Sequence, residues 1–211
     1  MIYNQHSNIK GTHAFLSPSK HSWIRYSEDK LIQTYKNSKA VQRGTLMHAV
    51  ANVLISLRIK LPRTKATFNM YVNDAIGYHM QPEQPLYYSE FCYGTADAIY
   101  YDEHKKFLRI HDLKTGISPV HMEQLEIYAA LFYLEYGKEV GYTPTDDNTE
   151  LRIYQLDDVL VHVPSANDIL AIADKIVEFT NILGSTKDEG DNPDYAGVLE
   201  LVENLDIVPK I

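Results

Sequence analysis

The sequence predicts a mixed α/β domain (α+β) in which a central mixed β-sheet is flanked by helices. Two β-rich runs, residues 95–101 and 106–115, enclose the polar segment 102–105, which has the composition of a hairpin turn. Helical patterns precede and follow this pair of strands. Two more strand patterns, within residues 150–163, then lead into an amphipathic helix.

The composition is that of one globular domain. The 211 residues are 45% apolar, enough for a substantial core, and we expect a single domain over residues 1–186 followed by an acidic tail over residues 187–211. Cys92 is the only cysteine, which excludes an internal disulfide and a four-thiolate metal site. The start MIYNQHSNIK lacks the apolar run of a signal peptide, and no later run is long enough to span a bilayer, so a cytoplasmic protein with no membrane partner is expected.

Charge is distributed unevenly along the chain. The net charge is −8, but residues 1–65 hold 11 Lys and Arg against 2 acids, while residues 66–211 hold 9 against 26. The basic part, residues 1–65, is also expected to be helical. It offers a surface to a polyanion such as DNA or RNA, although an ordinary solvated face also concentrates lysines.

Helices are predicted over most of the N-terminal part. Ser17 and Pro18 resemble the N-cap and N1 positions of a first helix, and residues 28–40 form a polar helical stretch. Residues 42–60 are nearly all apolar in their centre and predict a helix buried on most sides. Its exceptions, His48, Asn52 and Ser56, recur every four residues as one polar stripe, which faces either solvent or a cleft.

The next predicted elements lead to the central strands. Residues 67–80 show helical spacing, residues 81–85 are expected to break that helix, and residues 86–92 read as a strand. The hairpin then follows. If Tyr101 pairs with Lys106, Asp97 faces Ile110 and lies diagonal to Asp112.

This register has a chemical consequence. Because side chains alternate along a strand, Asp97, Asp112 and Lys114 fall on one face of the sheet. Two carboxylates this close are unfavourable unless a cation or a shared proton neutralises them.

A helix is predicted directly after these strands. Ser118 is its expected N-cap, Pro119 its first residue and Gly137 its stop. Its N-terminal amides could receive a phosphate. Gln124 and Tyr128 lie one turn apart on one face of this helix.

The C-terminal part completes the domain. Residues 150–156 and 158–163 predict two strands, and residues 165–183 an amphipathic helix that begins with Ser165 and Asp168 as a variant capping box. From Lys187 the chain holds 7 acids and 2 lysines and includes an apolar segment near residues 198–208. This tail is a solvated arm, an oligomer contact or a competitor of nucleic acid, and the sequence does not choose among these.

The ordered motifs of residues 44–136 resemble those of the PD-(D/E)XK nuclease superfamily, in its RecB-like and phage-type exonuclease branch. The motifs are Gly44 to His48, an aspartate on one strand, Asp-x-Lys at the end of the next, and Gln-xxx-Tyr on a helix. The resemblance implies a restriction-endonuclease-like core. Many relatives carry four cysteines for an iron–sulfur cluster, which this chain lacks.

The resemblance also implies a set of site residues. Asp97 and Asp112 would bind a divalent metal, with His48 and the Leu113 carbonyl as further ligands. Lys114 would orient or activate the attacking water and stabilise charge on the phosphate. The other implied members are Gln124 and Tyr128, which would contact the nucleic acid, and an upstream acid, which is Glu83 with Glu90 as the alternative.

The resulting hypothesis is a DNA exonuclease that depends on Mg²⁺ or Mn²⁺ and acts on a linear duplex or a single strand. Carboxylate ligands favour both cations, and one imidazole tilts the site toward Mn²⁺. A homo-oligomer or a recombination partner protein is compatible with the sequence. The alternatives are a non-catalytic nucleic-acid- or partner-binding protein with this fold, and a structural domain in which Asp112 and Lys114 form a buried ion pair.

Overall fold

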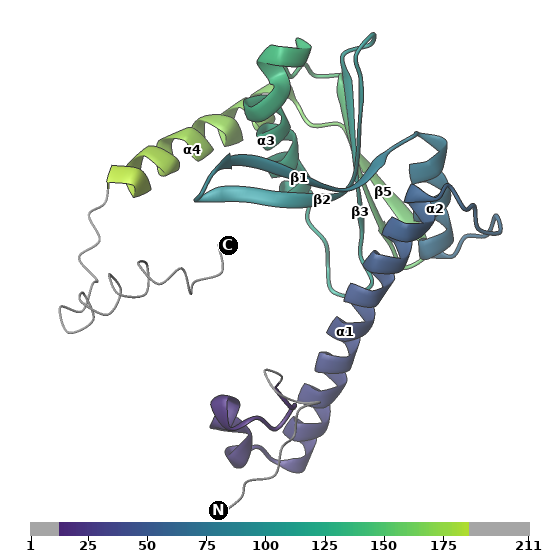
Figure 1. Ribbon diagram of the computed structural model, residues 1–211, viewed down its shortest axis with the longest axis vertical. Coiled ribbons are helices and arrows are strands. Elements are labelled where there is room, and N and C mark those ends of the chain that lie inside the picture. The colour runs from purple at the N-terminus through teal and green to yellow at the C-terminus, as the bar shows by residue number, and fades with distance from the viewer. Residues whose placement is uncertain (1–12, 186–211) are drawn as a thin grey trace, which may run out of the picture.

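The computed structural model describes residues 13–185, which form helices packed against both faces of one sheet (Figure 1). The predicted acidic tail, with its apolar segment, lies outside the described residues. In chain order the helices are η2 (Pro18–Arg25, a 3₁₀ helix), α1 (Glu28–Ser56), α2 (Thr67–Gly77), α3 (Glu123–Val140) and α4 (Ala166–Ser185). None of the helices within 13–185 combines the length and apolarity needed to cross a bilayer.

The sheet has five strands in the order β1-β2-β3-β4-β5. They are β1 (Gln81–Ser89), β2 (Cys92–Asp102), β3 (Phe107–Leu113), β4 (Thr149–Gln155) and β5 (Asp158–His162). The β3–β4 pair is parallel, and α3 makes the crossover that this pairing requires; the other pairs are antiparallel. The predicted α/β class and the mixed sheet flanked by helices are confirmed.

Two apolar clusters hold the layers together. One lies under α3 and α4 and contains Leu108, Ile110 and Leu151 from the central strands. The other lies under α2 and the C-terminal half of α1 and contains Ala98, Leu113 and Tyr154 from the same strands. Burying both faces of β2–β4 fixes their positions, so residues at the ends of these strands are held firmly.

Helix α1 differs from the expectation for residues 42–60. It is a single helix from Glu28, capped by Ser27, and its N-terminal half extends past the sheet (Figure 1). Leu46 is 62% and Val53 55% exposed, so the predicted burial on most sides is wrong. A helix that lies against one sheet buries a single face, here around Ala51 and Ile55.

Strand β1 corrects the prediction that residues 81–85 interrupt the chain. They pair with β2, and the strand ends at Ser89, so Cys92 belongs to β2. β1 is an edge strand, where Pro82 and Pro85 are tolerated because an edge residue needs no partner on its outer side.

Helix α3 begins later than predicted. Its first residue is Glu123 rather than Pro119, because Gln155 Nε2 donates to the carbonyls of Gly116 and Ser118 at 2.7 and 2.9 Å and holds this segment outside the helix. The predicted stop is also wrong: Gly137 is buried inside α3, and the left-handed Gly141 ends the helix.

The predicted strand pair β4–β5 is present, and the capping box of α4 is confirmed. The amide of Asp168 donates to Ser165 Oγ, and the amide of Ser165 donates to Asp168 Oδ2, each at 3.2 Å.

Candidate metal centre

Three carboxylates form a row across β1, β2 and β3. Pro82 pairs with Ala98, which in turn pairs with His111, so the next positions along these strands bring Glu83, Asp97 and Asp112 side by side. The predicted pairing of Tyr101 with Lys106 is wrong, because Tyr101 pairs with Leu108. The true register is shifted by two residues, so Asp97 lies opposite Asp112 rather than diagonal to it.

His48 reaches this row from α1. Its Nδ1 lies 3.3 Å from Asp97 Oδ2, and the amide of Leu113 donates to the same oxygen at 2.8 Å. His48, Glu83 and Asp97 each offer one ligand atom within 4.8 Å of the other two. Within the polar stripe of α1, His48 therefore lies at the cavity of the carboxylates, whereas Ser56 is exposed, so the cleft alternative applies at His48 and not along the whole stripe.

Asp112 and Lys114 form the second half of the site. Asp112 is only 4% exposed, and Lys114 Nζ donates to its Oδ1 at 3.1 Å. The same ammonium donates to Gln124 Oε1 at 2.7 Å, so α3 holds the lysine in place. Nζ is also 3.0 Å from Oδ2 of Asp112, but without hydrogen-bond geometry. The buried Oδ2 accepts no hydrogen bond from any residue within 13–185.

Burial and the charge of Asp97 raise the pKa values of two of these carboxyl groups, Asp112 and Glu83. Burial raises the pKa of Asp112, and the charge of Asp97 raises it further, against the opposing effect of Lys114. Burial and Asp97 likewise raise the pKa of Glu83, which His48 partly offsets. The row therefore holds more negative charge than its neighbours compensate.

His48 responds to the same excess of negative charge. Its contact with Asp97 raises the pKa of the imidazole, against the effect of burial, and the charges of Asp112 and Glu83 add to this. A cation that binds His48 must displace this proton, so its affinity should rise with pH.

Glu83 has an unusual backbone conformation. Its φ is 49°, in the left-handed region that a non-glycine residue seldom adopts, although the flanking residues Pro82 and Gln84 pair normally with β2. Such conformations cluster at functional sites, where the surrounding structure maintains them. Glu90, the alternative upstream acid, is exposed in the turn after β1 and lies apart from the carboxylate row.

Two other predicted residues have different surroundings. The ring of Tyr128 packs against Gly94 of β2, where a Cβ atom would lie 2.9 Å from Tyr128 Cε1. Packing accounts for this tyrosine, and its contact with nucleic acid stays a prediction, as does the Leu113 carbonyl ligand.

The predicted phosphate site at the start of α3 is not supported, because the first turn contains Glu123 and Glu126, whose charges oppose an anion.

The sequence did not single out Thr115. It lies in the loop after β3 and lines a cavity of about 500 Å³ together with His48, Glu83 and Asp97. Its hydroxyl is so close to Gly44 of α1 that a Cβ at that position would lie 2.8 Å from Oγ1. The sequence feature that points to this contact is Gly44, one turn before His48. A side chain at that position would push α1 away from the site.

The donor set fits a hard divalent cation. His48, Glu83 and Asp97 could hold it, and the buried Asp112 Oδ2 is a further oxygen without a hydrogen bond from the described residues. Carboxylate oxygens with one imidazole suit Mg²⁺ and Mn²⁺. No family model, no curated protein and no solved structure matches this chain.

Proposed function

We propose that this protein is a nuclease that depends on Mg²⁺ or Mn²⁺ and hydrolyses phosphodiester bonds in DNA, most simply as an exonuclease. One observation carries the proposal. Glu83 and Asp97 converge with His48, and Asp112 on the next strand adds a buried carboxylate oxygen that has no hydrogen-bond partner among the described residues.

Each residue has a distinct task in this proposal. A bound divalent cation would neutralise charge that develops on the phosphate and make water a stronger nucleophile near neutral pH. His48, Glu83 and Asp97 would hold the cation, and the Leu113 amide keeps Asp97 oriented for this.

Lys114 is the protein's own positive charge at the site, in addition to the cation. Asp112 and Gln124 hold its ammonium from two sides, so it does not need to reorganise when a phosphate arrives. Its side chain is 31% exposed, which leaves it accessible to a substrate. We assign it to stabilising the phosphate charge and orienting the attacking water.

The surface of α1 supports DNA as the substrate. Three cavities follow this helix and share lining residues, the last being the cavity at His48. Cations and aromatic rings both line this path, a combination that suits a nucleic-acid strand because cations bind phosphates and rings stack on bases. They are Phe15, Lys20, Trp23, Tyr26, Tyr35, Lys36, Lys39 and Arg43.

The test is digestion of DNA by the purified protein. We expect linear DNA to be degraded with Mg²⁺ or Mn²⁺ and not with EDTA, and a covalently closed circle to stay intact if the protein is an exonuclease. Asp112→Asn should lower the rate at least about 100-fold. Asp174→Asn, on the exposed side of α4, is the matched control and should keep full activity.

Two results would overturn the proposal. Equal activity of wild type and Asp112→Asn would show that a contaminant digests the DNA. Metal-independent DNA binding without digestion, across linear and circular substrates, would instead support the non-catalytic nucleic-acid-binding alternative.

A further inference from the structure

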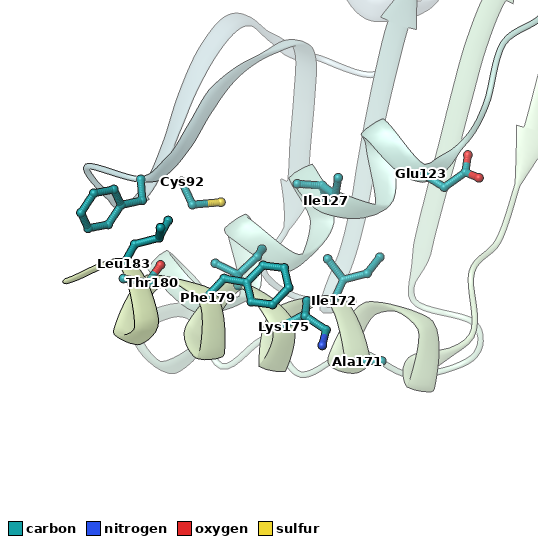
Figure 2. A pocket seen from close by; sticks show the side chains of 11 residues that line it. Cys92, Glu123, Ile127, Ala171, Ile172, Lys175, Phe179, Thr180 and Leu183 are labelled. Atoms are coloured by element: carbon teal, nitrogen blue, oxygen red, sulfur yellow. The ribbon is translucent and has the colours of Figure 1, made fainter. Parts of the chain in front are cut away.

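An apolar groove lies between α3, α4 and the β1–β2 turn (Figure 2). Its volume is about 570 Å³. Its side chains come from α3, α4, the β1–β2 turn and Cys92 at the start of β2, and Figure 2 shows Ile172 and Phe179 of α4 beside Ile127 of α3. The large apolar residues among them that are exposed are Phe91, Ile127, Phe179 and Leu183.

These side chains are exposed although they are large and apolar. Phe91 is 47%, Phe179 52% and Leu183 48% exposed, and Ile127 adds 41% from α3. Single exposed apolar residues are common on proteins, but a contiguous group in a concave surface indicates a partner that covers it. Buried residues of α4 such as Ile169 already pack into the core. The exposed side chains of the groove are therefore left for another segment or molecule to cover.

The chain itself leads to this groove. Leu183 lines it, and α4 ends two residues later at Ser185. Gly184 lies next to Phe91 of the β1–β2 turn, since a Cβ on this glycine would be 4.0 Å from the ring. The 26 residues from 186 to 211 therefore start at the rim of the groove.

The sequence of that segment contains a matching apolar pattern. Apolar residues recur every three or four positions, the spacing of one helical face, and the acids Glu200 and Glu203 fall on the other side. The apolar stripe is Val198, Leu201, Val202, Leu205 and Val208, while Leu199 and Ile207 fall on the side of the acids.

The lengths agree as well. A helix over residues 198–208 would be about 15 Å long, and the stretch of α4 that lines the groove, from Ala171 to Leu183, spans about 18 Å. The intervening 186–197 can extend to roughly 40 Å, which is ample for the chain to turn back along α4.

We propose that residues 198–208 of this chain occupy the groove, with their apolar stripe against Phe91, Ile127 and Phe179. The tether favours this segment over a second copy, because a short flexible connection gives an effective concentration of about a millimolar. The inference is independent of the proposed nuclease activity.

Cys92 provides a reporter at the right place. It lines the groove, and it is the only cysteine of the chain. The experiment measures how fast its thiol reacts with an aromatic disulfide reagent in the full-length protein. We expect the thiol to react at least about tenfold faster in the double variant Leu201→Asp/Leu205→Asp than in wild type, because the tail then leaves the groove.

The control is Glu200→Gln/Glu203→Gln, which changes the opposite side of the segment and should leave Cys92 protected. Thermal unfolding of all three proteins shows whether the described domain is intact. Equal reaction rates in wild type and the Asp variant would overturn the proposal. So would protection of Cys92 that weakens on dilution, because that result identifies a second copy as the occupant.

A second measurement uses the same thiol. Leu201→Cys and Leu205→Cys, made separately in the full chain, should form an intramolecular disulfide with Cys92 on mild oxidation in at least one case. Glu203→Cys should form it much less. Failure of both apolar positions to react, or equal yields at all three, would contradict the docking.

Discussion

Replacing Glu83 by glutamine should stabilise the protein without metal and destabilise it with metal. In the metal-free protein Glu83 and Asp97 place like charges on neighbouring strands, with ligand atoms within 4.8 Å of each other. Burial and this repulsion raise the pKa of Glu83, so its charged form opposes folding. The neutral amide has nearly the same shape and removes the repulsion.

The expected magnitude follows from Coulomb's law. At 4.8 Å, two unit charges repel by about 0.9 kcal/mol in water and about 3.5 kcal/mol at an effective dielectric constant near 20. Glu83 is half-buried, so we expect a gain of about 1 kcal/mol, or roughly 2–4 °C in Tm for a domain of this size. Protonated His48 offsets part of the repulsion, so the measurement belongs well above neutral pH.

Metal should reverse the order of stability. A cation that binds only the folded wild type at 100 times its Kd stabilises it by about 2.7 kcal/mol. The Glu83→Gln variant loses one ligand and should lose most of this gain. Thermal unfolding in EDTA and in Mn²⁺ therefore gives opposite rankings of the two proteins.

The matched control is Glu90→Gln, which removes the same charge from the exposed turn after β1. It should unfold like wild type in both conditions. The reasoning is refuted if Glu83→Gln is less stable than wild type in EDTA, or if Mn²⁺ stabilises the two variants and wild type equally.

Three further predictions concern other parts of the structure. Lys114→Met leaves the buried Asp112 carboxylate without its cation and should lower the free energy of unfolding by about 2 kcal/mol in urea denaturation, most of which Asp112→Asn should restore in the double variant. Gly137→Ala should cost about 2 kcal/mol, because its Cβ would lie 2.9 Å from the Tyr142 carbonyl oxygen, whereas Gly77→Ala, with open space around it, should gain about 0.5 kcal/mol. Burial raises the pKa of Tyr142 to about 12, so the unfolded state loses this proton first and stability should fall as pH rises from about 10 to 12; Tyr142→Phe should show a smaller fall.

The shared face of Asp97, Asp112 and Lys114 could be read from the sequence although the predicted register was wrong. A shift of two residues preserves which face each side chain occupies, because the strand period is two. The error changed the cross-strand partners, so that Asp97 lies opposite Asp112 and Tyr101 opposite Leu108, but it changed no residue's face. The face of the sheet on which a residue lies is thus a firmer inference than the residue with which it pairs.

Other features depended on contacts that the sequence does not display. Residues 81–85 contain two prolines and predict a break, but the edge position of β1 makes them compatible with a strand. The start of α3 is moved by Gln155, a residue more than thirty positions away. The apolar centre of α1 has no sequence mark that tells its exposed Leu46 from its buried Ala51, because only the placement against the sheet decides this.

The carboxylate row and the core beside it are energetically linked. Apolar pairs on the same strands, such as Ile99 with Ile110 and Ile110 with Leu151, fix the register that brings the acids together. Their burial offsets the repulsion among the acids, which would otherwise separate the strands. A cation removes that same repulsion, so its affinity and the instability of the metal-free site have one origin. Neutralising Glu83 or Asp97 should relieve the repulsion and for the same reason weaken cation binding.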